Sequence, residues 1–514
     1  MTLEQRLGQL LAVGYDGLEP PPWLIDWIKL GRVGGIILFG DNLDQPRQVA
    51  ELTATLQALA PVPLLFYIDQ EGGIVSRLRE PATVVPGAMA LAATGDPARA
   101  QQAAGLLATE MRALGLHVNL APVLDIQSNP TKRVLGIRCY GDTPETVREF
   151  GLAAIRGYQA NGVLATAKHF PGLGESDLDS HHDLPAIPHP KARLHQVELL
   201  PFKAAIEAGV DLIMTSHARF PAYDPERPAT LSPAILTGLL RQTLGFKGLI
   251  ATDALEMNAL ADRYPPEERA VLALEAGVDL LMPAHGAELQ QRVFWGLLEA
   301  VRAGRISEER LEASLARVMA AKARLSATAV PPLTVVGCAE HRATAQRLAD
   351  ESITLVKDAG LLPLRLSQSQ TLGVIDFSLP RFSLVEEARQ ATALLAAEIG
   401  RRWPQSWVKS FSARLSDEDS PAVLAAAQEA DTLLVITRNA DDWAGQARCV
   451  QALLAMRKPI VIAAVRNPFD LKVWPEAGTY LCTYGDATVQ LRALVRVLFG
   501  AVVARGLLPV SLDI

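Results

Sequence analysis

Ionisable side chains stand at the ends of several short apolar runs in this sequence. They are Asp69, Lys168, His169, His217 and Asp253. Carboxylates placed across a pocket from an acid/base group suit the cleavage of glycosidic bonds, because one carboxylate attacks the sugar carbon while the other group protonates the leaving oxygen. Catalytic metal sites usually need several converging histidine and carboxylate ligands, and the first apolar run offers no His-x-His pattern. We therefore predict a glycoside-cleaving site that uses neither a metal nor another cofactor.

Asp179 and His181 stand two residues apart in a polar segment. In an extended loop both side chains would project to the same side and could meet. An aspartate bonded to one ring nitrogen fixes the histidine tautomer and raises its basicity, so that the other nitrogen can donate a proton to a leaving oxygen. We expect the nearby Gly172 and Gly174 to let this loop move and close over a substrate.

These side chains need a scaffold that brings distant segments together, and the hydrophobic pattern predicts one. Eight short β-rich runs recur at 9–14, 33–39, 64–69, 117–121, 163–169, 212–217, 249–253 and 279–283. Segments with helical spacing lie between them, such as 46–59, 97–114, 145–160, 192–208, 233–244 and 267–276. Strands that alternate with helices predict a parallel sheet covered on its outside, and eight of them predict a (β/α)₈ TIM barrel with its site at the carboxyl ends of the strands. The alternative is an open doubly wound sheet, which would want a glycine-rich phosphate loop that residues 14–17 match poorly.

A domain boundary is predicted near residue 330. Helical patterns at 289–303 and 307–325 are followed by the stretch SATAVPP at 326–332, whose small residues and prolines are typical of a linker. Because a single core rarely grows beyond roughly 300 residues, we expect two domains, residues 1–330 and 331–514.

The second domain is predicted to be a smaller three-layer α/β/α sandwich. Four runs typical of buried strands (371–376, 432–437, 460–465 and 479–483) alternate with helical stretches (384–399, 421–430 and 443–456). Residues 439–443 and Arg466-Asn467 stand at strand ends and are candidates for the pocket. Packing support is the main role we expect of this domain.

The composition excludes some classes of partner. The chain has 49 Lys and Arg residues against 56 Asp and Glu residues, a net charge of −7, whereas nucleic-acid-binding proteins normally show a basic face. No run of about 20 uncharged apolar residues predicts a membrane span, and the N-terminus lacks the pattern of a secretory signal. The four cysteines lie far apart and are expected to be free thiols in a reducing compartment. These features indicate a cytoplasmic protein with no nucleic-acid or membrane partner, and they leave its oligomeric state open.

Four segments resemble one known family. The stretch 168–181, KHFPGLGESDLDSH, resembles the KHFPGxGxxxxDSH signature of the β-N-acetylglucosaminidases of glycoside hydrolase family 3. Residues 68–77 (IDQEGGIVSR) are similar to a second motif of the family, and 251–257 (ATDALEM) to the segment that carries its nucleophile. Residues 351–364 (ESITLVKDAGLLPL) resemble the opening of the C-terminal sandwich in its two-domain members, so the resemblance covers nearly the whole chain. The chain departs from the family pattern at Leu173, Glu175 and Thr252, where the family often has His, Asp and Ser.

The resemblance implies a role for each predicted site residue. Asp253 would be the nucleophile, which forms a covalent glycosyl intermediate and retains the anomeric configuration, and Asp179 and His181 would be the acid/base pair. Sugar hydroxyls would be bound by Asp69, Arg77, Arg138, Lys168 and His169, while His217 would line the pocket floor. Because neighbouring strand residues face opposite ways, Lys168 and His169 can reach one sugar only if the backbone is distorted. We expect a strained or non-proline cis peptide near His169, a feature that costs about 3–4 kcal/mol.

The implied function is that of a metal-independent, retaining β-N-acetylglucosaminidase. Its partner would be a small carbohydrate, a peptidoglycan-derived fragment in which GlcNAc is β-linked to N-acetylmuramic acid or its anhydro form, with a role in cell-wall recycling. Three alternatives stay open: a β-N-acetylglucosaminide phosphorylase, a β-glucosidase of the same family, and a sugar-binding protein without catalysis. A neutral histidine in place of a carboxylic acid lets anionic phosphate approach without like-charge repulsion, so the sequence does not separate hydrolase from phosphorylase.

Overall fold

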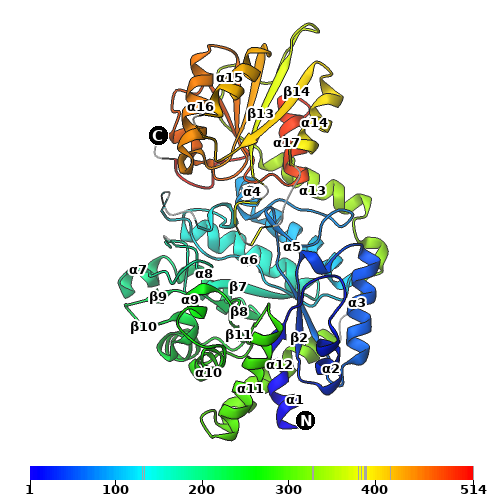
Figure 1. The fold of residues 1–514 in the computed structure, drawn as a ribbon, viewed down its shortest axis with the longest axis vertical. Helices are drawn as coiled ribbons and strands as arrows, with labels where there is room; N and C mark the ends of the chain where they lie inside the picture. The colour runs from blue at the N-terminus through cyan, green and yellow to red at the C-terminus, as the bar shows by residue number, and fades with distance from the viewer. Residues whose placement is uncertain are drawn as a thin grey trace.

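The protein consists of two lobes, each built around its own sheet (Figure 1). The computed structural model describes residues 1–129, 131, 134–176, 178–326, 329–379, 381–383, 385–386, 391–416 and 418–512. The N-terminal lobe, blue to green in Figure 1, contains a seven-stranded sheet, and the C-terminal lobe, yellow to red, contains a six-stranded sheet. Part of the predicted linker, at 327 and 328, lies outside the described residues.

The first sheet is entirely parallel, and its strands follow the order of the chain. They are β1 (Ala12–Val13), β2 (Gly35–Leu38), β3 (Leu65–Ile68), β6 (Val118–Asn119), β7 (Leu164–Phe170), β8 (Leu212–Thr215) and β11 (Leu249–Ala251). Leu280 forms a parallel bridge with Ala251 of the last strand, and Leu281 forms one with Leu11 beside the first. The eighth predicted run therefore contributes single bridges where a full strand was expected. The predicted alternation of strands and helices around a parallel sheet is confirmed.

Helices connect these strands and pack on the outside of the sheet (Figure 1). The longer ones are α2 (Pro22–Leu30), α3 (Pro46–Leu59), α5 (Pro97–Ala113), α6 (Pro144–Ala160), α8 (Leu200–Glu207), α10 (Pro266–Ala276), α11 (Ala287–Arg302) and α12 (Glu308–Ser326). Several begin with proline, which needs no hydrogen-bond partner for its nitrogen in the first turn. Asp96 and Thr143 cap α5 and α6 by accepting the backbone N–H groups of Ala98 and Thr146.

Shorter elements complete the N-terminal lobe. They are the helices α1 (Leu3–Gly8), α4 (Ala88–Ala93), α7 (Lys191–Gln196) and α9 (Asn258–Ala261), and the antiparallel pairs β4 (Gln70–Gly72) with β5 (Val75–Ser76) and β9 (Arg219–Phe220) with β10 (Asp224–Pro228). The predicted helix at 233–244 is a π-helix over Ala234–Thr243.

The C-terminal lobe is a mixed sheet between helices. Its strand order is β12 (Thr354–Lys357), β17 (Thr479–Cys482), β16 (Ile460–Ala464), β15 (Thr432–Thr437), β13 (Leu372–Ser378) and β14 (Ser406–Ser412), with only the β12–β17 pair antiparallel. The helices are α13 (Ala339–Ser352), α14 (Ala391–Arg402), α15 (Ser420–Gln428), α16 (Ala444–Ala455) and α17 (Thr488–Leu498). All four predicted strands are present, but the two edge strands β12 and β14 were missed because they are only half-buried and lack a continuous apolar run. The predicted helix at 384–399 is described only from Ala391, and part of it lies outside the described residues.

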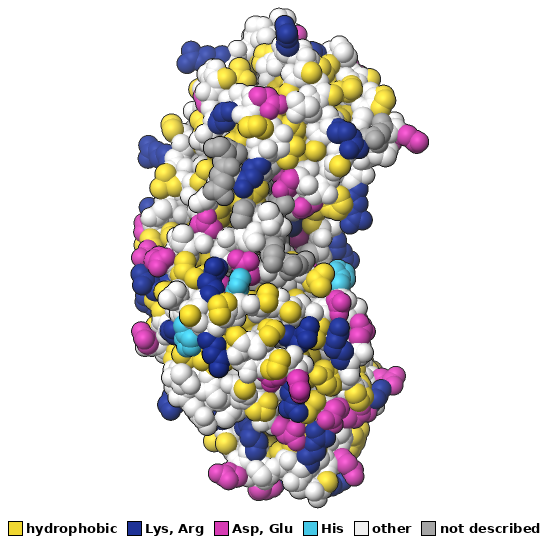
Figure 2. All heavy atoms as spheres, turned by 90° about the vertical axis from the view of Figure 1, so that its left-hand side faces the viewer, with side chains coloured by type: hydrophobic (Ala, Val, Ile, Leu, Met, Phe, Trp, Pro, Cys, Tyr) yellow, Lys and Arg dark blue, Asp and Glu magenta, His cyan; other side chains and the backbone are white. Residues whose placement is uncertain are grey.

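The chain segment that joins the lobes is held by a buried carboxylate of the first lobe. Glu110 of α5 accepts the backbone N–H groups of Thr83 and Gly337, each at 2.9 Å. Nδ1 of His341, on α13, lies 2.8 Å from the same carboxylate. On the face shown in Figure 2, basic and acidic side chains intermingle, and the outline is indented on one side between the lobes. All four cysteines are free, as predicted, and none of the helices described here is long and apolar enough to cross a membrane.

Candidate active site

The carboxyl end of β7 contains the predicted backbone distortion. The peptide bond between Lys168 and His169 is cis, and no other non-proline bond among the described residues is. The pairing of β7 with β8 is correspondingly irregular between Ala167 and Phe170. Lys168 and His169 both line one cavity, which we call the strand-end cavity. The expectation of a non-proline cis peptide near His169 is confirmed.

Lys168 lies in a buried cluster of opposite charges. Its Nζ is 2.9 Å from Oδ1 of Asp69 and 2.7 Å from Oε1 of Glu71. Arg138 donates to Glu71 through Nε at 2.9 Å and Nη2 at 2.7 Å. Burial alone would raise the pKa of Glu71, but the charges of Arg138 and Lys168 outweigh it and hold this pKa far below its usual range. Glu71 is therefore an ionised carboxylate that fixes two of the predicted sugar-binding cations.

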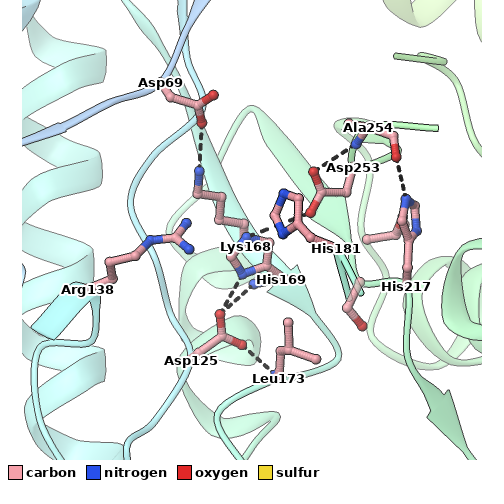
Figure 3. A network of polar contacts seen from close by, with 12 residues as sticks. Asp69, Asp125, Arg138, Lys168, His169, Leu173, His181, His217, Asp253 and Ala254 are labelled. Carbon is pink, nitrogen blue, oxygen red and sulfur yellow. Dashed lines mark hydrogen bonds and ion pairs between the residues drawn. The ribbon is translucent and has the colours of Figure 1, made fainter. Parts of the chain in front are cut away.

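Sequence reasoning did not identify Glu71 as a site residue, although it lies within the IDQEGG motif. Burial alone would lower the pKa of Lys168, yet Asp69 and Glu71 together raise it above its ordinary value. Lys168 therefore stays charged in spite of its 2% exposure. The cluster presents a fixed ammonium, a fixed guanidinium and the carboxylate of Asp69 at one cavity (Figure 3).

His169 is oriented by a second carboxylate that sequence reasoning missed. Oδ2 of Asp125 lies 2.7 Å from Nδ1 of His169 and accepts its backbone N–H at 3.1 Å. Oδ1 of Asp125 accepts the backbone N–H of Leu173 at 2.5 Å. Both oxygens of Asp125 already accept backbone N–H groups, so Oδ2 also accepts from Nδ1 of His169. Nε2 of His169 faces Asp253, with 4.0 Å between Nε2 and Oδ2. Asp125 follows the predicted fourth strand by four residues, and that position was the one available signal for it.

Asp253 stands just beyond β11, where its carboxylate faces the cavity together with His169 and His181 (Figure 3). The backbone N–H of Ala254 donates to Oδ1 of Asp253 at 2.8 Å. Burial alone would raise the pKa of Asp253, but the neighbouring histidines, His169 above all, and this hydrogen bond lower it below its ordinary value. Asp253 is therefore an ionised carboxylate at neutral pH, which is the state that a nucleophile requires.

His217 differs from the prediction that it lines the pocket floor. Its side chain is 1% exposed, and both ring nitrogens have protein partners. Nε2 donates to the carbonyl of Ala254 at 2.9 Å, and Nδ1 lies 2.7 Å from Oγ1 of Thr230. Burial lowers the pKa of His217, which favours the neutral form of the ring. His217 thus supports Ala254, the residue that follows Asp253, and it lines neither of the two cavities described in this section, so its predicted place on the pocket floor is corrected to a supporting one.

Asp179 and His181 meet as the sequence predicts. Oδ1 of Asp179 is 2.7 Å from Nδ1 of His181 and accepts its backbone N–H at 2.9 Å. Burial alone would lower the pKa of His181, but the hydrogen bond to Asp179 and its charge raise it above the ordinary value. The same contact lowers the pKa of Asp179 in spite of its burial. Among the described residues Nε2 of His181 has no hydrogen-bond partner, and it lines the cavity with Asp253, where it could donate a proton.

The two loop glycines, Gly172 and Gly174, lie very close to neighbouring segments. A Cβ on Gly174 would lie 1.9 Å from the carbonyl oxygen of Ile126, and one on Gly172 would lie 2.8 Å from Cβ of Glu198. Gly172 also has a φ of +127°, which other residues rarely adopt. These glycines allow close packing of the loop base against its neighbours, and the expected movement of the loop stays a prediction.

The C-terminal lobe forms one wall of the site. Nη1 of Arg77 donates to the backbone carbonyl of Val385 at 2.6 Å, while Nη2 lies 3.6 Å from Oδ2 of Asp69. Arg466 donates to Glu386 through Nη1 at 2.8 Å and Nη2 at 2.6 Å. A second cavity, the interlobe cavity, shares His169, His181, Asp253 and Glu386 with the first and is also lined by Asn439, Trp443, Arg466 and Asn467.

The topology explains why these residues meet. In the C-terminal sheet β13 lies between β14 and β15, so the order of strands reverses at this point. Open α/β sheets bind ligands at the carboxyl ends of strands beside such a reversal. Asn439 and Arg466 follow the carboxyl ends of β15 and β16 and line one cavity with residues from the carboxyl ends of the first sheet. The carboxyl ends of the strands of both sheets thus face one cleft.

The site combines an ionised carboxylate, a protonatable imidazole and fixed polar groups. No group of three or more His, Cys, Asp or Glu side chains in the described part of the chain could hold a metal ion. The arrangement can supply nucleophilic attack by Asp253 and proton transfer by His181 across one cavity.

Comparisons with known proteins place this arrangement in a family. The model of the N-terminal domain of glycosyl hydrolase family 3 matches residues 2–321. The chain belongs to glycoside hydrolase family 3. A family 3 β-N-acetylglucosaminidase from Paenibacillus sp. has a solved structure that is 40% identical, with a TM-score of 0.94 over 100% of this chain and 99% of that one.

Two further relatives extend the comparison within family 3. The beta-hexosaminidase A of Pseudoalteromonas piscicida is 32% identical over 585 residues, which cover 100% of this chain and 97% of the relative. A solved β-glucoside phosphorylase is 25% identical, with a TM-score of 0.83 over 100% of this chain and 94% of that one. The predicted family and enzyme class, a glycoside hydrolase of the β-N-acetylhexosaminidase type, are confirmed.

Proposed function

We propose that the protein is a retaining exo-β-N-acetylglucosaminidase in which Asp253 is the nucleophile and His181, aided by Asp179, is the acid/base. The observation that carries the proposal is that Asp253 and the His181–Asp179 pair line the same cavity in complementary protonation states. Retention of configuration needs such a nucleophile and such a proton donor on either side of the scissile bond.

The first step would form the covalent intermediate. Asp253 attacks the anomeric carbon, the glycosidic C–O bond breaks, and Nε2 of His181 gives its proton to the leaving oxygen. Asp179, bonded to Nδ1, holds the ring in the orientation that points Nε2 at that oxygen. In the second step Nε2 takes a proton from water, the water oxygen bonds to the anomeric carbon, and Asp253 leaves.

The fixed polar groups of the strand-end cavity would bind the hydroxyls of the terminal sugar. Asp69, Arg77, Arg138, Lys168 and His169 all line this cavity. Their buried partners hold them before the substrate arrives, which reduces the entropy lost on binding.

The scaffold would be a closed TIM barrel, residues 1–330, followed by an α/β/α sandwich, residues 331–514. Closure is supported by the parallel bridges of Leu280 and Leu281 to Ala251 and Leu11 at the two edges of the first sheet. The boundary is supported by the end of α12 at Ser326 and by the separate six-stranded sheet beyond it.

The substrate would be a small peptidoglycan-derived fragment with GlcNAc β-linked to N-acetylmuramic acid or its anhydro form, turned over in the cytoplasm during cell-wall recycling. The resemblance of residues 168–181 to the signature of family 3 β-N-acetylglucosaminidases supports this substrate class. Four free cysteines, three of them buried, are consistent with a reducing compartment.

A second candidate function is phosphorolysis. It is favoured by the likeness to a β-glucoside phosphorylase and by a histidine where most glycosidases have a carboxylic acid, since a neutral base does not repel phosphate.

The deciding experiment compares aryl β-glycosides of GlcNAc and of glucose, with and without millimolar phosphate, and identifies the released sugar. Free GlcNAc at a rate independent of phosphate supports the hydrolase. GlcNAc-1-phosphate formed only with phosphate establishes the phosphorylase, and faster turnover of the glucoside would reject both acetamido-sugar assignments.

A further inference from the structure

The loop that carries Asp179 and His181 is tied together at its base by side chains from three segments. We define the loop clasp as Ser128, Glu175, Arg193 and Glu198. Glu175 directly follows Gly174 at the base of the loop, Arg193 lies on α7 after the loop, and Ser128 belongs to the segment that follows β6. The clasp therefore joins the entrance and the exit of the loop to the wall of the first lobe.

Glu175 is at the centre of these contacts. Oγ of Ser128 donates to Oε1 of Glu175 at 2.7 Å, and Nη2 of Arg193 lies 3.6 Å from the same oxygen. Nε of Arg193 donates to Oε1 of Glu198 at 3.2 Å, and Cβ of Glu198 lies against Gly172. The side chain of Glu175 is 10% exposed, so its charge interacts with these partners with little competition from water.

The outer part of the loop is held by weaker contacts. Arg263 pairs with Asp183 at 2.8 Å, but the two side chains are 38% and 55% exposed, and exposed pairs contribute little. Ala259 donates its backbone N–H to the carbonyl of Ser180 at 3.2 Å. The position of the His181 side chain therefore depends mainly on the contacts that hold the base of the loop.

We propose that Glu175 is a positioning residue, which acts through the loop clasp to hold His181 where Nε2 reaches the leaving oxygen. The proposal rests on the proposed role of His181 as general acid. Glutamate is one methylene longer than aspartate, and its carboxylate contacts Ser128 and Arg193 at the same time. A general acid works only within hydrogen-bond reach of its target. A small displacement of the loop would therefore slow proton transfer to the leaving oxygen and leave the sugar-binding cavity unchanged.

The test compares two substrates that differ in their need for an acid. N,N′-diacetylchitobiose has a poor leaving group that must be protonated, whereas 2,4-dinitrophenyl β-GlcNAc has one that departs without help. We expect Glu175→Ala to lower kcat/KM for chitobiose about 10- to 100-fold and for the dinitrophenyl glycoside less than about 3-fold. Glu175→Gln keeps the acceptor for Ser128 and should restore part of the loss.

Arg263→Ala is the matched control, because it removes a contact of the same loop at an exposed position, and it should leave both rates near the wild-type values. Equal loss on both substrates would show a general structural role and overturn the proposal, and so would no loss on either. If Glu175→Ala does not fold, Ser128→Ala replaces it, with the same selectivity expected. A wild-type enzyme that cleaves neither substrate would reject the proposed function itself.

Discussion

Asp125 binds His169 twice, through Nδ1 of the ring at 2.7 Å and through the backbone N–H at 3.1 Å. Its second oxygen accepts the backbone N–H of Leu173 at 2.5 Å. One fully buried carboxylate therefore fixes both the ring that faces Asp253 and the first turn of the loop that carries His181.

Asp125→Asn should keep the shape of this side chain but present an amide to Nδ1. The amide has one acceptor oxygen where the carboxylate has two, so it can no longer accept from both His169 and the backbone N–H of Leu173, and we expect kcat/KM to fall about 100-fold or more. Steady-state kinetics, together with a thermal melt that shows the variant is folded, checks this. An unchanged kcat/KM would contradict the role of Asp125.

Asp253→Ala should reduce turnover about 10⁴-fold or more, because it removes the group that attacks the anomeric carbon. Azide, a small anion that fits the vacated space, should restore glycoside cleavage and yield the glycosyl azide of inverted configuration. Product analysis by NMR distinguishes this outcome. Wild-type rates without azide would rule out Asp253 as the nucleophile.

The pH profile should report the Asp179–His181 contact. His181 must be protonated in the first step, and its pKa is raised above the ordinary 6.5, so kcat/KM should decline only above that pH. Asp179→Asn removes the charge that raises this pKa, and the alkaline limb should move to lower pH. The acid limb should lie below 3.8, since the pKa of Asp253 is lowered from that value. If the alkaline limb does not move in Asp179→Asn, the limb does not report the titration of His181.

Glu71→Gln should destabilise the fold, because Lys168 and Arg138 lose their buried counter-charge. We expect a loss of about 3 kcal/mol in the free energy of unfolding at pH 7. The folded-state pKa of Glu71 lies below its ordinary 4.5, so the carboxylate stabilises the folded state above that pH and less as the pH falls. Urea denaturation at pH 7 and at pH 4 should therefore show a smaller difference at pH 4. A difference independent of pH would be evidence against an ionised Glu71.

Gly174→Ala should destabilise the loop base, because the added Cβ would lie 1.9 Å from the carbonyl oxygen of Ile126. We expect a loss of about 1–3 kcal/mol together with reduced activity. Gly400→Ala is the matched control, since Gly400 lies in α14 with no atom near the position of its Cβ, and it should be neutral or stabilising. Equal effects of the two substitutions would exclude the close-packing role of Gly174.

The parts of this molecule that were predictable depend on local pattern. The apolar runs predicted the strands, and the requirement that Lys168 and His169 face one pocket predicted the distortion at their peptide bond. Two of the observed strands end before the polar residue of their run, since β8 ends before His217 and β11 ends before Asp253.

The parts that were not predictable depend on contacts between distant segments. Glu71 contacts Lys168 and Asp125 contacts His169, and each partner lies far away in the sequence. The close packing of Gly174 was not predictable, because its neighbour Ile126 is 48 positions away and no local signal reports that approach. Edge strand β14 was missed because its half-buried residues lack an apolar run.

The hydrogen bond from Arg77 to Val385 joins the lobes at the pocket through a backbone oxygen. Every amino acid carries that acceptor, so exchange of the side chain at 385 leaves the bond intact. Related chains can therefore differ in the side chain at position 385 and still keep this hydrogen bond between the lobes. Covariation between positions 77 and 385 would then not reveal the contact.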